Sequence, residues 1–231
     1  MNQVKIVAYT QAKTSAFENI EGGEEDFIAY CARVSNPGNQ NNTKTAPKLL
    51  AYLIKNKHWS PFEMASVTME ITTTRDISRQ ILRHRSFSFQ EFSQRYAVSE
   101  DFCLRETRIQ DKKNRQNSTP IDPNNRDDVL TNEYWLEQQA ELIKRTKSLY
   151  KWALDAGIAK EQARAILPEG NTGTTLYMAG TLRSWVHYCQ LRGANGTQKE
   201  HSEIADLCWE ELKSIYPNVI EACELVENWW A

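Results

Sequence analysis

The sequence lacks the features that would place the protein in a membrane, outside the cell or along a nucleic acid. Its 231 residues contain no apolar run near the roughly 18 residues of a membrane span, and residues 1–10 lack the long apolar core of a signal peptide. The formal net charge is −2, whereas proteins that follow a nucleic acid backbone usually carry a basic excess. These absences predict a cytoplasmic protein with no membrane or nucleic-acid partner, in which any anion site is local.

Cysteine is scarce as well, and its distribution excludes two structural classes. The five cysteines are an odd number and include no Cys-x-x-Cys pair, which fits a reducing compartment and neither a disulfide framework nor a zinc knuckle. No His-Glu-x-x-His or comparable cluster indicates a metal site. We therefore predict no bound metal and interpret all five cysteines as small buried side chains, not nucleophiles: Cys31, Cys103, Cys189, Cys208 and Cys223.

Length and hydrophobic periodicity indicate the fold class. With 40% hydrophobic residues the chain can bury one sizeable core, so we expect one domain over residues 1–231. Alternating apolar residues predict strands over 4–9 and 67–72, and residues 172–177 form a strand or a turn. Helical spacing and capping residues predict helices over 24–34, 45–58, 75–85, 126–156, 160–167, 181–191 and 197–215, and after Pro217. Long helices with a few strands indicate an α+β fold.

Two of these segments carry more specific expectations. The helix over 126–156 has a broad apolar stripe that includes Trp135, Leu142 and Leu149, and it ends at Gly157, a favourable residue just past a helix end. The helix over 24–34 is expected to turn Val34 towards the core. Residues 110–126 are polar and nearly free of apolar side chains, so we interpret them as a surface excursion without chemistry.

Charge concentrates on the helix over 75–85 and on the loop that follows it. Arg75, Arg79 and Arg83 stack at successive i, i+4 positions, and for Arg75 and Arg79 a solvated basic face is the favoured interpretation. The segment Arg83-His84-Arg85 precedes a loop in which serine, glutamine and arginine alternate with aromatic residues. Guanidinium groups and hydroxyls bind phosphate, so this loop predicts an anion site. The alternative is a basic helix end that offsets its own C-terminal dipole.

An ordered set of motifs surrounds this loop. The segment Arg83-His84-Arg85, then seven residues, then Ser93 with Arg95-Tyr96, resembles the signature of the flavin-dependent thymidylate synthases. Upstream lies His58-x-Ser60-Pro61-Phe62-Glu63, and downstream lie Ala163-Arg164-x-x-Leu167-Pro168, Leu191-Arg192 and Gln198-x-Glu200, in the family's order. Such an ordered set, covering roughly residues 45 to 215, is far more specific than a single short motif.

The resemblance implies which residues bind the two nucleotides. It implies FAD contacts at Ser60, Arg83, His84, Arg85, Glu91, Thr181, Arg183 and His187. It implies dUMP contacts at Gln80, Ile81, Leu82, Arg83, Glu91, Phe92, Ser93, Gln94, Arg95, Arg164 and Arg192. The sequence departs from the family pattern at Met64, Gln90 and Thr181, and it is one residue longer between Glu169 and Thr174.

The resemblance also implies an activity and an assembly. It implies methylation of dUMP to dTMP, with FAD reduced by NADPH, methylenetetrahydrofolate as the one-carbon donor and Arg192 as the catalytic residue. A fixed cation beside the uracil ring would stabilise the negative charge that develops there. The implied fold is one α+β domain with a small, mostly antiparallel sheet, assembled as a homotetramer with sites where subunits meet. Seven tryptophans give weak support for such an interface: Trp59, Trp135, Trp152, Trp185, Trp209, Trp229 and Trp230.

Two alternatives stay open at this point. One is a related flavin- and folate-dependent enzyme that modifies another deoxypyrimidine or transfers a different one-carbon group. The other is a nucleic-acid-binding module that would use the arginines of residues 75–95 on phosphates, against the net charge of −2. Without the resemblance, His84 and His187 are typical of core histidines, His58 of a helix end and His201 of a solvent-exposed position.

Overall fold

A four-stranded antiparallel sheet forms the centre of the molecule in the computed structural model, which describes residues 1–13 and 23–226. Trp229 and Trp230 lie outside the described residues. The strand order is β1-β2-β6-β3, and the strands span Gln3–Tyr9 (β1), Ser66–Thr74 (β2), Ser88–Glu91 (β3) and Gly173–Thr181 (β6). The prediction of an α+β fold with a small antiparallel sheet is therefore confirmed.

The long pair β2–β6 fixes the register of the sheet. Its nine residue pairs run from Ser66 opposite Thr181 to Thr74 opposite Gly173. Along β2 the side chains of Val67, Met69 and Ile71 are buried while the residues between them are partly exposed. This is the alternation that the sequence predicted for 67–72, and it places one face of the sheet on the core.

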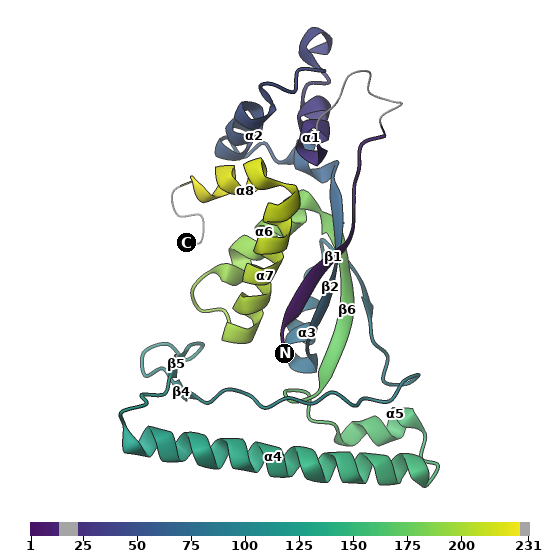
Figure 1. Cartoon of the computed structure of the whole chain (residues 1–231), viewed down its shortest axis with the longest axis vertical. Helices are drawn as coiled ribbons and strands as arrows, with labels where there is room; N and C mark the ends of the chain where they lie inside the picture. Colours follow the sequence, from purple (N-terminus) through teal and green to yellow (C-terminus); the bar gives the residue numbers. More distant parts are fainter. Residues whose placement is uncertain (14–22, 227–231) are drawn as a thin grey trace.

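Helices cover the sheet and close its two ends. Figure 1 shows α6, α7 and α8 against one side of the sheet, α1 and α2 beyond one end, and α4 with α5 across the other. The helices span Glu24–Ala32 (α1), Ala46–Lys55 (α2), Arg75–Ile81 (α3), Arg126–Asp155 (α4), Lys160–Ala163 (α5), Leu182–Gly193 (α6), Lys199–Ile215 (α7) and Pro217–Glu224 (α8). Short 3-10 helices span Pro37–Asn39 (η2), Ser60–Glu63 (η3) and Arg164–Ile166 (η4).

The structure corrects the sequence at three places. Helix α3 ends at Ile81, four residues before the predicted end, because the next residues form tighter turns. Val34 is 69% exposed, since α1 ends at Ala32 and Val34 follows in a turn. The polar excursion contains a small hairpin, β4 (Arg108–Gln110) paired with β5 (Ser118–Pro120). The uncertain segment 172–177 is a strand that continues to Thr181.

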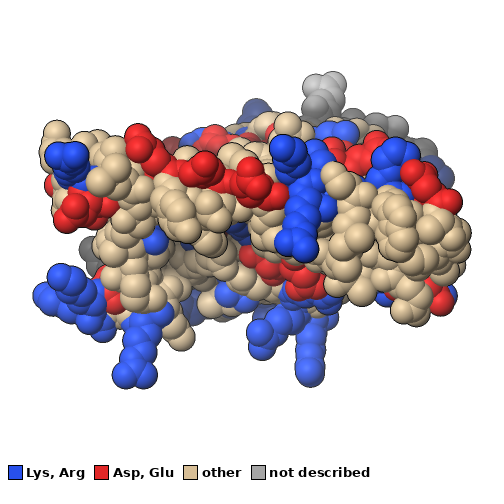
Figure 2. Space-filling view, turned by 90° about the horizontal axis from the view of Figure 1, so that it is seen from below, with Lys and Arg blue, Asp and Glu red and all other residues tan. Residues whose placement is uncertain are grey.

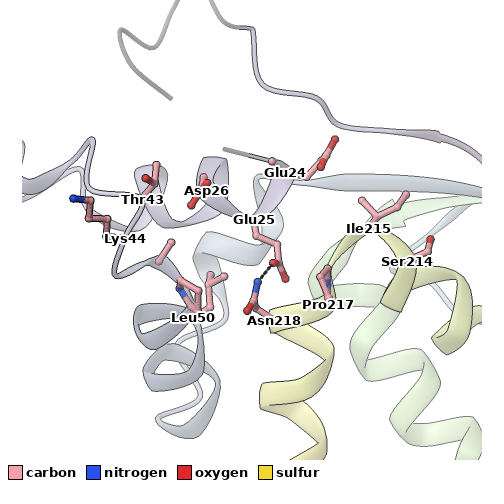
Figure 3. Close-up of a pocket in the computed structure, with 13 residues that line it drawn as sticks. Glu24, Glu25, Asp26, Thr43, Lys44, Leu50, Ser214, Ile215, Pro217 and Asn218 are labelled. Carbon is pink, nitrogen blue, oxygen red and sulfur yellow. Dashed lines mark hydrogen bonds between the residues drawn. The ribbon is translucent and has the colours of Figure 1, made fainter. Parts of the chain in front are cut away.

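A buried carboxylate joins the two ends of the chain. Glu25 on α1 accepts hydrogen bonds from the Asn218 side chain and, at 2.8 Å, from the Val219 backbone N–H at the start of α8 (Figure 3). Burial raises the pKa of Glu25. The adjoining cavity, about 440 Å³, is lined by residues of α1, α2 and the α7–α8 junction, and by no side chain that the sequence predicted as a ligand contact.

Helix α4 leaves much of its apolar stripe uncovered. Trp135, Leu142 and Leu149 recur every seventh residue and each is close to half exposed, although Ala153 on the same stripe is buried. Seen from the side on which α4 lies, many acidic side chains lie along the upper edge and several Lys and Arg side chains project from the lower edge (Figure 2). The surface between them is largely uncharged and carries a few charged side chains. Monomeric soluble proteins rarely expose large contiguous apolar surfaces, so this face is a candidate contact surface.

Candidate active site

Helix α6 carries the predicted ligand contacts Arg183, His187 and Arg192, and its start is fixed by a side-chain cap. Thr181 ends strand β6 in an extended conformation, and its Oγ1 accepts a hydrogen bond from the Ser184 backbone N–H at 3.3 Å. An N-cap of this kind satisfies one of the unpaired donors of the first helical turn. The predicted FAD contact Thr181 therefore already serves as a helix cap.

The first half of α6 lies against η3, where several of the predicted FAD contacts gather. Arg183 forms an ion pair with Glu63 of η3. The ring of His187, one turn further on, lies edge-on to Trp59 with centroids 4.7 Å apart. Burial, and next the charge of Arg183, lower the pKa of His187, so the imidazole is neutral at pH 7. The exposed Ser60 follows Trp59 directly, which brings Ser60, Arg183 and His187 to one place.

The last turn of α6 meets the Arg83-His84-Arg85 segment. Arg192 Nε donates a hydrogen bond to His84 Nε2 at 2.9 Å, although the two residues are 108 positions apart. Burial, and next the charge of Arg192, lower the pKa of His84 to about 4. A neutral imidazole is required here because a protonated Nε2 could not accept this bond. His84 therefore orients the guanidinium of Arg192.

Tight turns after α3 determine where the basic segment points. The His84 backbone N–H donates to the Ile81 carbonyl at 3.0 Å and the Arg83 N–H to the Gln80 carbonyl at 3.3 Å, both i to i−3 bonds. Arg83 and Arg85 are exposed while His84 turns inward. The chain then passes Phe87, whose ring lies so close to Gly180 that a Cβ there would come within 2.4 Å of it. Glycine at this position of β6 is what allows the loop to approach the sheet.

Gln80 and His201 form a second polar group beside Arg192. His201 is completely buried, so the expectation of a solvent-exposed histidine is wrong; the residue lies in the first turn of α7, against α6 and α3. Its Nδ1 lies 3.2 Å from Gln80 Oε1 and its Nε2 lies 3.1 Å from the hydroxyl of Tyr188. Gln80 Nε2 in turn donates to Gln198 Oε1 at 2.8 Å. The sequence contained no signal for this network, because it joins residues on three helices.

Glu91 is held inward by groups on α3 and β6. Its Oε1 accepts hydrogen bonds from Ser78 Oγ at 2.8 Å and from Thr174 Oγ1 at 3.1 Å, and it lies 3.5 Å from Arg75 Nη1. The Arg75 side chain is 12% exposed, so its interpretation as a solvated charge is wrong. Arg79 agrees with that interpretation, since it lies at the surface and pairs with Glu169. Arg75 thus compensates a half-buried carboxylate.

The predicted dUMP contacts Ser93, Arg95 and Arg164 lie beside helix α5. Arg95 Nε is 3.4 Å from Glu161 Oε2 on α5, which places the loop that begins at Ser93 beside the segment that carries Arg164. Phe92 and Arg95 are exposed, whereas Gln94 is buried and donates to Ser99 Oγ at 3.0 Å. The predicted dUMP contacts therefore fall into two groups: Gln80 and Arg192, joined through His84 and His201, form one, and Ser93 and Arg95 lie beside the segment of Arg164 in the other.

Two predicted dUMP contacts have side chains that face the protein. Ile81 is completely buried in the main core, and Leu82 packs against the same core. Their backbone groups are thus the parts that remain for a ligand. Both residues nevertheless matter for the site, because their burial fixes the point where α3 stops and the basic turn begins.

The polar excursion lines a large cavity next to Gln198. The cavity measures about 770 Å³ and extends from β4 and β5 to the start of α4. Arg105 crosses its edge, with Nη2 2.5 Å from Asp76 Oδ1 and Nη1 3.2 Å from Glu200 Oε1. Sequence reasoning missed Arg105, whose partners lie on α3 and α7, far away along the chain.

The titratable groups of the described residues limit the available chemistry. All five cysteines are free, and burial raises the pKa of every one of these thiols. A thiol with a raised pKa is a poor nucleophile at pH 7. Within residues 1–13 and 23–226 there is no group of three or more side chains suited to a metal ion. In the same ranges, no helix has the length and apolar character needed to cross a membrane.

Comparisons with known proteins agree with one another. Residues 18–218 match the family model described as thymidylate synthase complementing protein. The chain is 51% identical to a protein of Paramecium bursaria Chlorella virus 1 named as a probable flavin-dependent thymidylate synthase, over 87% of this chain and 91% of that protein. It is 50% identical to the flavin-dependent thymidylate synthase of Synechocystis, over 87% and 89%. A Streptomyces cacaoi UMP/dUMP methylase shares the fold, with a TM-score of 0.79 at 24% identity over 97% of this chain and 95% of that one.

Proposed function

The chain belongs to the thymidylate synthase complementing protein family, and from that premise we propose that it methylates dUMP to dTMP with FAD, NADPH and methylenetetrahydrofolate. The observation that carries the proposal is the sequence identity to two proteins over 87% of this chain. It is 50% to a protein named a flavin-dependent thymidylate synthase and 51% to one named a probable flavin-dependent thymidylate synthase. The protein is accordingly a methyltransferase. Folate and the nicotinamide nucleotide enter the proposal as cosubstrates because that reaction requires them.

The residues around η3, those of the first half of α6 and the basic turn after α3 together suit a bound dinucleotide. Exposed guanidinium groups at Arg83 and Arg85 can bind the two phosphates of FAD, and the hydroxyl of Ser60 is free to donate or accept. The neutral His187 ring adds a planar surface. FAD, when bound, would accept a hydride from NADPH and mediate one-carbon transfer. The departures at Gln90 and Thr181 leave these groups in place, since Thr181 has its own role as the α6 cap.

Arg192 is the proposed catalytic residue for dUMP. His84 holds its Nε, which leaves the two terminal nitrogens of the guanidinium to face a ligand. A fixed cation placed against the uracil ring stabilises the negative charge that develops when N3 ionises, and that charge makes C5 nucleophilic. The thiols have raised pKa values, so attack by a cysteine is not part of the proposal.

The proposed assembly is a homotetramer in which subunits share each dUMP site. Two observations support it: the predicted dUMP contacts fall into two groups within one protomer, and α4 exposes an apolar stripe. A stripe with a seven-residue repeat suits packing against another helix. We also propose that the enzyme acts in the cytoplasm, because five free cysteines suit a reducing compartment.

Product analysis tests this function directly. Purified protein should be yellow, and NADPH with dUMP should bleach its flavin absorbance. With methylenetetrahydrofolate added, dUMP should be converted to dTMP, and tritium should be released from 5-labelled dUMP. Parallel reactions with UMP and dCMP, and reactions that omit one cosubstrate, serve as controls.

A product heavier than dUMP by a group other than methyl would favour the related deoxypyrimidine-modifying enzyme instead. Colourless protein that binds single-stranded DNA would favour the nucleic-acid-binding module.

A further inference from the structure

A buried histidine next to the nucleotide site has both ring nitrogens occupied. His201 has no exposed surface, and its two nitrogens contact Gln80 and Tyr188. A buried polar ring without partners destabilises the folded state, so these contacts stabilise its position. Neither His201 nor Tyr188 belongs to the residues that the family resemblance implicates in binding.

The partners determine which nitrogen of His201 carries the proton. Tyr188 is buried and its pKa is raised well above 10 by that burial, so its hydroxyl keeps its proton and can donate. The acceptor within reach is His201 Nε2, at 3.1 Å. Burial lowers the pKa of His201 to about 3, with smaller contributions from the charges of Arg192 and His84, so the ring is neutral. Its single proton is then on Nδ1, where it is donated to Gln80 Oε1 at 3.2 Å.

This proton fixes the orientation of the Gln80 carboxamide. Oε1 accepts from His201 while Nε2 donates to Gln198 Oε1, and Gln198 is held in turn by Glu200 Oε2 at 2.9 Å. Glu200 is anchored by its ion pair with Arg105. The partly exposed carboxamide keeps one free N–H and one free lone pair. The edge of a uracil ring offers the complement, because carbonyl oxygens flank the N3–H.

The same tyrosine packs against the residue that holds Arg192. The Tyr188 ring meets the His84 ring edge-on, with centroids 4.9 Å apart and planes at 81°. His84 accepts the hydrogen bond from Arg192. Tyr188 thus links two groups that face the nucleotide. The Tyr188 ring packs against His84, which holds Arg192, and the Tyr188 hydroxyl bonds to His201, which holds Gln80.

We propose that His201 is a positioning residue for pyrimidine recognition: its Nδ1–H sets the Gln80 carboxamide for the uracil edge, and Tyr188 joins that carboxamide to the His84–Arg192 pair. The inference rests on the proposed function, because Gln80 and Arg192 take part as contacts of dUMP. It adds a role for residues of α6 and α7 that do not themselves touch the ligand.

Four variants of the FAD-loaded enzyme separate this role from simple packing. His201→Phe keeps a ring and removes both hydrogen bonds. His201→Asn keeps an amide N–H near the Nδ1 position, whereas His201→Gln reaches towards Tyr188 and leaves Gln80 without its donor. The matched control is Leu212→Ala, which removes a buried apolar side chain from the same helix and breaks no hydrogen bond. Each variant is measured for FAD content, thermal midpoint, dUMP Kd by calorimetry, and kcat and KM for dTMP formation.

His201→Phe should raise the dUMP Kd and KM about tenfold or more at unchanged FAD content, because one to two hydrogen bonds in the binding machinery are lost. His201→Asn should bind dUMP at least about fivefold more tightly than His201→Gln, and Leu212→Ala should lower the thermal midpoint without shifting Kd. If His201→Phe does not fold, the comparison of Asn with Gln decides. Equal Kd values for His201→Asn and His201→Gln would overturn the inference, as would a folded His201→Phe enzyme with wild-type Kd.

A second readout needs no substrate. Nitrogen-15 spectra of histidine-labelled protein should show an imidazole with the proton on Nδ1 that disappears in His201→Gln, while the Nδ1-protonated imidazole of His84 remains. A proton on Nε2 would overturn the inference even if dUMP is the substrate. Failure of wild-type protein to bind dUMP would instead overturn the proposed function, and this inference with it.

Discussion

Arg192 shows what the sequence can and cannot predict about a single residue. The resemblance of Leu191-Arg192 and Gln198-x-Glu200 to the family motifs selected Arg192 as the catalytic candidate, which the residue alone would not have done. Its hydrogen-bond partner could not be predicted. His84 is 108 positions away along the chain, and without the resemblance it is typical of a core histidine. His201 was predicted on the surface for a related reason: its neighbours along the chain are charged, and its burial depends on α3 and α6.

Removing the Arg192 charge should stop turnover and leave binding of FAD intact. We expect Arg192→Ala to lower tritium release from 5-labelled dUMP by about 100-fold or more, in the range found when one electrostatic contact of a transition state is deleted. Flavin absorbance should show that FAD is retained, since Arg192 is a predicted contact of dUMP and not of FAD. The matched control is Arg126→Ala, an exposed arginine at the start of α4. Tritium release at the wild-type rate would remove Arg192 from the reaction.

The neutral histidines His84 and His201 should make stability fall in mild acid. Their pKa values are about 4 for His84 and about 3 for His201, against 6.5 in an unfolded chain. Between pH 6.5 and these values the unfolded chain binds more protons, so stability is greatest above pH 6.5 and falls as the pH decreases, by up to about 1.4 kcal/mol per pH unit for each histidine. The raised pKa of Glu25 acts in the opposite direction.

A comparison of variants isolates the contribution of one histidine. Thermal midpoints of wild type and His201→Gln, measured from pH 7.5 to pH 4.5 at one protein concentration, should show a flatter acid limb for the variant. Glu25 and the other carboxylates are common to both proteins, so their titration cancels in the difference. Parallel curves would mean that His201 titrates in the folded protein much as it does in the unfolded chain.

Among the elements, those with a complete local pattern were predicted, and those whose bounds depend on tertiary contacts were not. The alternation along β2 and the spacing and capping residues of α4 are visible in the sequence, and both elements form as expected. Helix α3 was predicted too long because its last residues have good helical character. The residues after Ile81 instead leave the helix, because Ile81 is fixed in the core and the Phe87 ring packs against Gly180.

The cap of α6 links local structure to the cofactor site. Thr181→Ala removes the acceptor for the Ser184 N–H, and we expect a loss of about 1 kcal/mol of stability together with weaker retention of FAD, because Arg183 lies in the first turn. Thr181→Ser keeps a hydroxyl acceptor and should restore both properties. Urea unfolding and the flavin-to-protein absorbance ratio measure the two effects. Unchanged stability in Thr181→Ala would show that solvent or another group caps the helix equally well.

At the scale of the whole molecule, α4 is the element that one protomer explains least. The sequence shows a broad apolar stripe along it, and in the structure Trp135, Leu142 and Leu149 of this stripe are each close to half exposed. A charge in the middle of the stripe should therefore disrupt assembly, and Leu142→Glu is expected to reduce the mass measured by light scattering. Ser148→Glu places the same charge at an exposed position on another side of α4 and should leave the mass unchanged. A Leu142→Glu protein with wild-type mass would place the subunit contacts elsewhere.

The division of the predicted dUMP contacts into two groups leads to a test of the complete assembly. Arg192 is held by His84 at the end of α6, whereas Arg164 lies in η4 beside the α5 residue that pairs with Arg95. If each site takes Arg192 from one subunit and Arg164 from another, Arg164→Ala and Arg192→Ala should each be nearly inactive alone. When the two proteins are mixed, dissociated and reassembled, some sites receive neither substitution and part of the wild-type rate should return. Native mass spectrometry of size-tagged subunits verifies that hybrids have formed, and Arg192→Ala reassembled with itself is the control. A single-chain site would gain nothing from mixing, because every protomer would still lack one of its own arginines.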